Sequence, residues 1–330
     1  MFKFIIRRLF VMIPTLIAVS IIAFIVIQLP PGDFLTMRVN QLIMQGENIE
    51  PQVLLDLQER YGLGDPIMVQ YWKWITKIIT RGDFGQSFDW TIPVSELIWS
   101  RLGLTVIISF TSLIFLWLVA FPIGIYSAVK KYSPGDYIAT FFGFIGVAIP
   151  DFLIALVLMF VSFKFFGASV GGLFSSEYVE APWSWGRVAD LMQHLWIPMI
   201  IIAMSGTASL IRTMRANLLD ELKRPYVITA RAKGLSETKL LMKYPVRVAL
   251  NPFISTVGWI LPTLVSGSTI ISIVLSLPTT GPLMLRALRS QDMYLAGAFI
   301  LLLSTLTILG TLFSDILLAL VDPRIRASQK

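Results

Sequence analysis

Long apolar runs separated by short polar segments dominate the pattern of this chain. About 20 apolar residues in a helix suffice to cross the hydrocarbon core of a bilayer, and six runs approach or exceed that length. We therefore predict an all-helical protein with six membrane spans. They cover Leu9–Leu29, Leu102–Val129, Tyr137–Phe163, Leu195–Ile211, Phe253–Leu277 and Met293–Val321.

One sizeable polar segment, residues 30–100, lies between the first two predicted spans. Pro51 and Gly62 bracket one amphipathic stretch, and a second has apolar residues at helical spacing: Tyr71, Trp74, Ile75 and Ile78. Such helices suit the membrane interface, and they equally suit a platform for an external partner. We predict three regions: residues 1–29 with the first span, an external insertion at 30–100, and a core at 101–330.

The composition supports a membrane protein and sets its orientation. Hydrophobic residues make up 55% of the chain and charged residues only 14%, which is too apolar for an ordinary soluble domain. Four connecting or terminal segments hold most of the basic residues, and residues 212–252 alone carry nine Lys/Arg against three acids. By the positive-inside rule, we expect both termini and this basic loop in the cytoplasm. The net charge of +7 then reflects topology, not nucleic-acid binding.

The basic loop contains a short pattern of its own at residues 226–236. Thr229, Ala230 and Ala232 are small enough for another protein to approach the backbone closely. Gly234 can adopt the left-handed conformation that ends a helix, and Ser236 can cap a following helix. We therefore expect a short helix, a sharp corner and a second short helix, which is a shape for docking.

Several kinds of chemistry have no candidate residues in this sequence. Cysteine is absent and His194 is the single histidine, so neither a disulfide nor a zinc or haem site is expected. No phosphate-binding Gly-x-x-x-x-Gly-Lys-Ser/Thr loop and no Ser/His/Asp trio is apparent. We expect neither an enzyme nor a bound cofactor.

A few polar positions inside the predicted spans are candidates for a transport path. Asp151 follows Pro150, which favours a kink, and an acid at membrane depth marks function by default. In the last span, Ser304, Thr307 and Thr311 share one narrow face with Ser314. Such a face is typical of helix packing, and it is also compatible with lining a path.

The motifs resemble the permease subunits of binding-protein-dependent ABC importers, in the dipeptide/oligopeptide family. The resemblance runs nearly from end to end. It rests on Arg7-Arg8-Leu9, Pro31-Gly32-Asp33, Gly82-Asp83-Phe84-Gly85, Thr229-Ala-Arg-Ala-Lys-Gly-Leu-Ser236 and Val321-Asp-Pro-Arg-Ile-Arg326. The insertion between the first two spans resembles the B-type of the family's two permeases.

The resemblance implies a type I importer fold, a bacterial or archaeal cytoplasmic membrane and a set of partners. These are a second, C-type permease, two ATP-binding subunits that hold ATP and Mg, and an extracytoplasmic solute-binding protein. It implies that the docking segment rests on one ATP-binding subunit and transmits its closure. The residues implied in this coupling are Tyr226, Thr229, Ala230, Arg231, Ala232, Lys233, Gly234, Leu235 and Ser236.

One departure from the family pattern leaves the cargo open. Ser272 stands where relatives commonly carry a glutamate, six residues before a turn that here reads Pro278-Thr-Thr-Gly281. Loss of an acid in the path weakly favours neutral polar cargo. Family membership favours peptides, and oligosaccharides are the alternative. An ion-coupled secondary transporter is a further alternative, and it would require a coupling site beyond Asp151.

Overall fold

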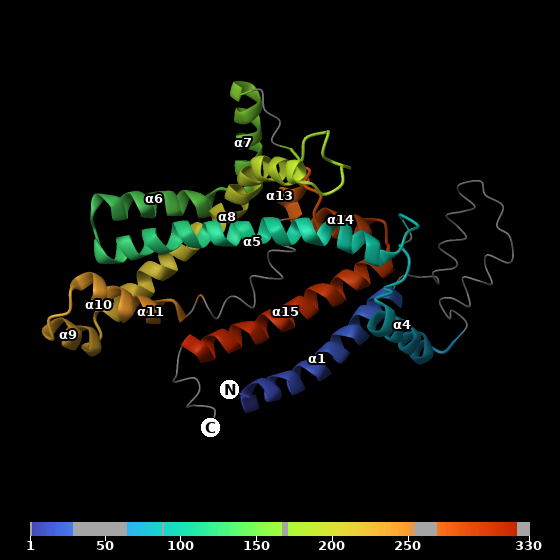
Figure 1. The fold of residues 1–330 in the computed structure, drawn as a ribbon, viewed down its shortest axis with the longest axis horizontal. Coiled ribbons are helices and arrows are strands. Elements are labelled where there is room, and N and C mark those ends of the chain that lie inside the picture. The colour runs from blue at the N-terminus through green and yellow to red at the C-terminus, as the bar shows by residue number, and fades with distance from the viewer. Residues whose placement is uncertain are drawn as a thin grey trace. The chain divides into compact units, whose positions relative to one another are not determined.

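The computed structural model describes residues 2–28, 65–87, 89–166, 171–251, 253 and 269–321. The chain divides into two compact units (Figure 1). The first comprises residues 1–103 and 283–309, and the second comprises residues 104–282 and 310–330. In the described part of the chain the regular elements are helices, and the only pairing of β type is an isolated bridge between Gln86 and Pro93. An all-helical fold is confirmed.

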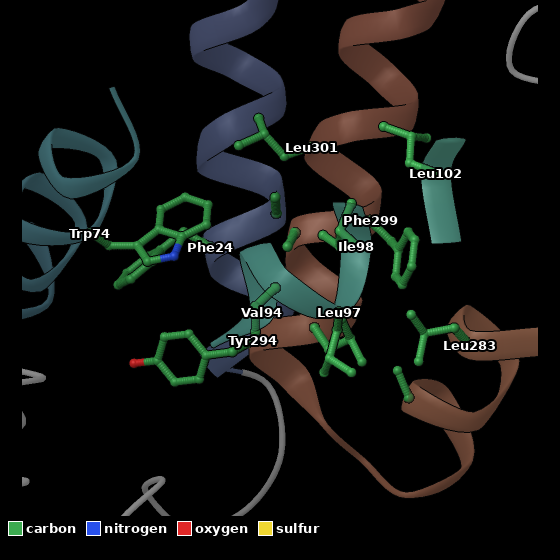
Figure 2. Packing of buried hydrophobic residues seen from close by; sticks show 14 residues of the cluster. Phe24, Trp74, Val94, Leu97, Ile98, Leu102, Leu283, Tyr294, Phe299 and Leu301 are labelled. Atoms are coloured by element: carbon green, nitrogen blue, oxygen red, sulfur yellow. The ribbon is translucent and has the colours of Figure 1, made fainter. Parts of the chain in front are cut away.

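In the first unit, helices α1 (Phe2–Gln28) and α4 (Ile67–Arg81) pack against one core. Figure 2 shows Phe24 and Trp74 side by side within this core, and their ring centroids are 5.6 Å apart. The predicted face of Tyr71, Trp74, Ile75 and Ile78 is confirmed, because all four contribute to the core. Gly82, at φ 64°, ends α4. The stretch bracketed by Pro51 and Gly62 lies outside the described residues.

Residues 82–87 and 89–93, between α4 and α5, are tied to the start of α15 (Met293–Val321) within the first unit. Asp292 is fully buried and accepts hydrogen bonds from the Ser87 hydroxyl and, at 3.3 Å, from the Asp89 backbone N–H. Arg286, on α14 (Thr280–Arg289), donates to Asp89 at 2.9 Å and lies over the ring of Trp90. Buried charges persist only where they are hydrogen-bonded in this way, so these contacts define the loop conformation.

Three described helices are long and apolar enough to cross a membrane. They are α5 (Val94–Val129), the first part of α8 (Trp185–Leu222) and α15. The pair α6 (Pro134–Ala148) and α7 (Asp151–Phe166) passes the same test only when its two helices are taken together. The chain is therefore a multi-pass membrane protein. The count of six spans stays a prediction.

The third predicted span is interrupted instead of continuous. Its two helices, α6 and α7, are bent by 98° at Ile149 and Pro150. Proline lacks the backbone donor and its ring restricts the preceding residue, so a helix tends to end there. The kink expected at Pro150 is therefore a full break, and Asp151 becomes the first residue of α7.

The fourth predicted span proves to be only the middle of a longer helix. α8 has 38 residues and continues well past Ile211, the predicted end. In the second unit it packs closely on α5: a side chain at Gly124 would meet Met214, and one at Gly206 would meet Leu116. Small residues at such contacts let membrane helices approach closely.

Beyond α8 the chain forms three short helices, α9 (Pro225–Ala232), α10 (Glu237–Lys243) and α11 (Pro245–Ala249). Figure 1 shows them clustered at the C-terminal end of α8. Of the fifth predicted span, residues 254–268 lie outside the described residues. The described remainder is α13 (Thr269–Val274), which ends before the predicted limit at Leu277. The turn from Leu275 to Thr279 separates α13 from α14.

Candidate functional site

The segment between α8 and α11 forms the candidate site, and we call residues 224–244 the elbow. Pro225 opens α9, where its missing N–H costs nothing. The helix ends in a Schellman motif: the N–H of Gly234 donates to Arg231 at 3.0 Å and the N–H of Leu235 donates to Ala230 at 3.4 Å. Gly234 has φ +79°, which confirms the left-handed corner.

A second helix follows the corner, as the sequence predicts. Ser236 occupies the N-cap position of α10, but its side chain makes no capping hydrogen bond. Ser236 is therefore at the predicted N-cap position, but the predicted hydrogen bond from its side chain to the helix is absent. The first turn instead carries Glu237, whose charge suits the positive end of the helix dipole.

One side of the elbow forms a small core. Val227, Ala230 and Leu240 are buried, and Leu235 and Tyr244 pack against them. Val227 and Ala230 are three residues apart and so share one face of α9. This corrects one expectation, because Ala230 supports the elbow from inside instead of offering its small surface outward.

The other side of α9 is exposed. Ile228 exposes 59% of its surface, a large fraction for an isoleucine. Seven further candidate residues are exposed with it: Tyr226, Thr229, Arg231, Ala232, Lys233, Gly234 and Ser236. The exposed side of α9 therefore combines one apolar side chain with small and basic residues.

Ion pairs fix the elbow without covering it. Arg231 donates two hydrogen bonds to Glu237, at 2.6 and 3.0 Å, and so links α9 to α10 across the corner. This contact raises the pKa of Arg231 and lowers the pKa of Glu237. The Tyr226 hydroxyl donates to Glu221 at the end of α8. These contacts set how α9 leaves α8.

The elbow is connected to the membrane helices through a packed junction. Met214 and Leu218 on α8 are fully buried against Val246 and Ala249 of α11. The short helix α11 returns onto α8 and so closes the elbow into one structural piece.

A buried ion pair joins α8 to α6, and no sequence pattern indicates it. Arg215 on α8 donates to both carboxylate oxygens of Asp136, at 2.9 and 2.8 Å. Asp136 is 2% exposed and also accepts from the Tyr132 backbone N–H at 2.9 Å. The Arg215 hydrogen bonds, together with that of Tyr132, hold the pKa of Asp136 below its ordinary value, although burial opposes them.

The sequence pattern does not reveal the pairing of Asp136 with Arg215, for a clear physical reason. The Ser133-Pro134-x-Asp136 pattern marks a helix start, and Ser133 does cap α6 by accepting from the Asp136 N–H at 3.3 Å. This pattern therefore predicts that Asp136 lies in the first turn of a helix. Nothing in the sequence indicates that Arg215, 79 positions away, faces it.

The structure does not gather the candidate path residues into one site. Asp151 is half-buried at the start of α7, and Ser272 is almost fully buried on α13. On α15, Thr307 and Thr311 are exposed, Ser304 is half-buried and Ser314 is buried. The Thr307 hydroxyl donates to the Leu303 carbonyl at 2.7 Å. A polar face along α15 is present, but its role stays a prediction.

Ser272 differs from the other path candidates in its hydrogen bonding. Its hydroxyl has no hydrogen-bond partner among the described residues, although its carbonyl accepts from Leu277 at 2.7 Å. The nearby Thr279 hydroxyl is in the same situation. Buried hydroxyls without a protein partner commonly bind water.

These observations define a class: an all-helical, multi-pass membrane protein with an exposed helical elbow at the end of its longest described helix. Residues 120–327 match the family described as the inner membrane component of binding-protein-dependent transport systems. Residues 1–111 match the family of the N-terminal part of such membrane components. The chain belongs to this family and is a permease subunit of an ABC importer, not an enzyme.

Full-length relatives agree with the family assignment. The oligopeptide transport system permease protein AppB of Bacillus subtilis is 36% identical over 98% of this chain and 99% of its own length. The dipeptide transport system permease protein DppB of Alkalihalophilus pseudofirmus is 30% identical, over 99% and 100%. The glutathione transport system permease protein GsiC of Salmonella paratyphi A is 31% identical, over 99% of each chain.

Proposed function

We propose that this chain forms half of the membrane path of an ATP-driven importer for oligopeptides, with α9 as the helix that couples it to ATP hydrolysis. The exposed face of α9, held rigidly on α8, is the observation that carries this proposal. A short helix that moves as one body transmits the closure of a partner better than a flexible loop does. ATP and Mg are held by separate subunits, and this chain supplies no phosphate-binding loop.

The partners follow from the family. We propose a second permease of the C-type, two ATP-binding subunits and an extracytoplasmic solute-binding protein, with this chain as the B-type permease. The exposed face of α9, with Ile228 at its centre, is proposed to dock into a groove on one ATP-binding subunit. The neighbouring basic side chains Arg231 and Lys233 favour an acidic rim on that groove.

A photo-crosslinking amino acid at Ile228 tests the docking in the assembled importer. We expect a crosslink to an ATP-binding subunit whose yield changes when nucleotide is added. The same amino acid at Met242, exposed on α10, is the matched control for general proximity. Equal yields from both positions, or no crosslink from position 228, would contradict the assignment.

Peptides are the proposed cargo because the three relatives above are named for oligopeptide, dipeptide and glutathione transport. Ser272 weakly favoured oligosaccharides in the sequence. It is buried within this chain, so it does not favour the alternative. Binding of a peptide library and an oligosaccharide panel to the cognate solute-binding protein decides the matter. Sugar binding without peptide binding would refute the peptide assignment.

We propose that path contacts come from Asp151, Ser304, Thr307 and Thr311, with Ser272 reached through water. The break before Asp151 supports this, because irregular backbone at membrane depth is tolerated where protein or water covers it. Replacement of Asp151 by Asn should change the peptide charge preference in uptake assays and leave assembly intact. An unchanged preference would assign Asp151 to helix packing.

We propose that both termini and the elbow are cytoplasmic and that residues 30–100 are external, in a bacterial or archaeal cytoplasmic membrane. The absence of cysteine allows single cysteines at Gln45, Ser133 and Ser328. In intact cells with a permeable outer layer, only position 45 should react with a membrane-impermeant thiol reagent. Labelling at 133 or 328 would reverse the topology.

A further inference from the structure

Helix α4 crosses the C-terminal end of α1 in the first unit (Figure 1). Three side-chain contacts join the two helices. In order from the end of α1 inward, they are Gln28–Gln70 at 3.1 Å, Phe24–Trp74 with ring centroids 5.6 Å apart, and Ser20–Tyr71 at 2.7 Å between the hydroxyl oxygens. A helix rises about 1.5 Å per residue, so these contacts cover about 12 Å of α1. The last two turns of α1 therefore support α4.

The order of these contacts determines how α4 is rotated about its own axis. Successive residues of a helix are about 100° apart, so Gln70, Trp74 and Tyr71 follow one another around α4 within an arc of about 100°. Gln70 meets the end of α1, whereas Tyr71 meets Ser20, about two turns further inside. The side of α4 beyond Tyr71 is therefore directed toward the middle of α1, and the side beyond Gln70 is directed away from it.

The side of α4 beyond Tyr71 is apolar and exposed. It carries Met68, Trp72 and Ile79, which lie within about 40° of one another around the helix, and we call these three residues the α4 stripe. They expose 73%, 66% and 77% of their surface. The stripe adjoins the face of α4 that packs into the core, so the apolar arc of this helix is wider than the core covers.

The rest of α4 is mostly polar. Its residues are Val69, Gln70, Lys73, Thr76, Lys77, Thr80 and Arg81, and α4 contains no acidic residue. A helix with an apolar arc, a basic polar arc and a tryptophan near their boundary is typical of the surface layer of a bilayer. Lys73 already pairs with Asp65, so membrane contact would depend on the apolar stripe and not on an unpaired cation.

The face of α1 below α4 shows which environment the stripe enters. Phe24 is buried where α4 covers it. Phe10, Ile13 and Ile17 continue the same face toward the N-terminus at helical spacing, and they expose 69%, 56% and 50% of their surface. They belong to the apolar run Phe10–Val26, which lies in the predicted first span. The α4 stripe is therefore continuous with a surface that suits lipid.

We propose that α4 is an interfacial anchor, with the α4 stripe immersed in the acyl region of the leaflet in which α1 ends. The polar arc of α4 faces the headgroups and water. In the proposed topology this leaflet is the outer one, but the depth follows from the contacts with α1 and is the same for either orientation. Of the two roles that the sequence left open for this helix, the geometry points to the membrane interface and not to a platform for an external partner.

Spin labels measure the depth of α4 in the assembled importer, held in lipid nanodiscs, with cysteine-free partner subunits. Met68→Cys and Ile79→Cys report on the stripe, because this chain has no cysteine of its own. Thr80→Cys is the matched control, since Thr80 is exposed on the polar arc directly after Ile79. Collision of each label with oxygen, which concentrates among acyl chains, is compared with collision with a water-soluble nickel complex. We expect the labels at 68 and 79 to lie about 5–10 Å below the lipid phosphates, and the label at 80 to lie at or above them.

Three results would overturn the proposal. Equal collision with the nickel complex at positions 79 and 80 would place the stripe in water. Weak collision with both reagents at positions 68 and 79 would show that protein covers the stripe. A fall in oxygen collision at these positions when the solute-binding protein is added would assign the stripe to a docking platform. Because nanodiscs expose both leaflets, none of these results depends on the proposed topology.

A photoreactive lipid tests the protein without any substitution. The probe is a phospholipid with a diazirine in the upper part of one acyl chain, and crosslinks are located by peptide mass spectrometry. We expect crosslinks at Met68, Trp72 and Ile79, and none at Thr80. Crosslinks at Phe10 and Ile17 without any on α4 would show that lipid covers α1 but does not reach the stripe, and the proposal would be wrong.

Discussion

Two arginine–carboxylate pairs lie near the basic loop, and they differ in burial. Arg215–Asp136 joins α8 to α6, and only 3% of the Asp136 side chain is exposed. Arg231–Glu237 joins α9 to α10, with 52% and 67% of its side chains exposed. Both pairs have two hydrogen bonds of similar length.

The two pairs have similar hydrogen-bond geometry, so burial decides how strongly the loss of one partner destabilises the protein. Removal of one partner from a buried pair leaves an uncompensated charge, whereas water replaces either partner of an exposed pair. Loss of the Arg215–Asp136 pair should therefore destabilise the protein, whereas loss of the Arg231–Glu237 pair should have little effect on stability.

The largest effect is expected from Asp136→Asn. Arg215 would lose its counter-charge in a partly buried site, at a cost of about 2–3 kcal/mol. We expect a lower thermal unfolding midpoint in detergent and reduced uptake. Arg215→Lys should be intermediate, since lysine cannot make the paired hydrogen bonds of a guanidinium.

Asp220→Asn is the matched control, because Asp220 is exposed on the same helix as Arg215. It should leave the unfolding midpoint unchanged. If Asp136→Asn also leaves the unfolding midpoint unchanged, the buried pair does not stabilise the contact between α6 and α8.

Next in size is the effect of Gly234→Val on coupling. A β-branched residue at φ +79° costs about 1–2 kcal/mol or more, so α9 should end differently and shift its exposed face. We expect normal assembly with a loss of substrate-stimulated ATP hydrolysis. Gly234→Asn should retain most activity, because asparagine tolerates the left-handed region. Full stimulation in the valine variant would contradict the coupling role of α9.

Acid should weaken the buried pair in a defined window. The pKa of Asp136 is lowered from 3.8 by Arg215, so the folded state binds this proton less readily than the unfolded state does. The contribution to stability is full above about pH 5 and is lost as the pH falls through the lowered pKa. Unfolding midpoints measured from pH 6 to pH 3 should fall more in the wild type than in Asp136→Asn. Parallel curves would exclude this linkage.

The smallest effect is expected from Glu237→Gln. Both partners of the exposed pair are solvated, so the unfolding midpoint should not change measurably. A modest loss of coupling is still expected, because the Arg231 contact orients α10 against α9. A drop in stability as large as that of Asp136→Asn would remove the distinction between the two pairs.

Local patterns made the elbow largely predictable. Small residues, a glycine and a serine over eleven positions gave two helices and a left-handed corner, because these features depend on near neighbours in the chain. The direction of Ala230 was not predictable in the same way. It depends on Leu240 and Tyr244 packing beneath it, which only the closed elbow establishes.

In the membrane helices, too, some features were predictable from the local sequence and others depended on tertiary packing. Apolar length predicted α5 and α15 well, because transfer into lipid depends on composition. It did not predict that the third run breaks at Pro150 or that α8 extends to Leu222. A proline permits either a kink or a break, and the packing of α6 and α7 on α8 selects between them.

The sequence by itself therefore determined the apolar spans, the helix ends at proline and glycine, the position of the basic loop and, through its motifs, the family. The tertiary structure alone decided which polar residues meet: Asp136 with Arg215, and Ser87 with Asp292. Helix formation and membrane preference are set by residues within a few positions of one another. A pair separated by 79 positions exists only once the helices that carry it have packed, because close contact alone gives their charges an appreciable energy.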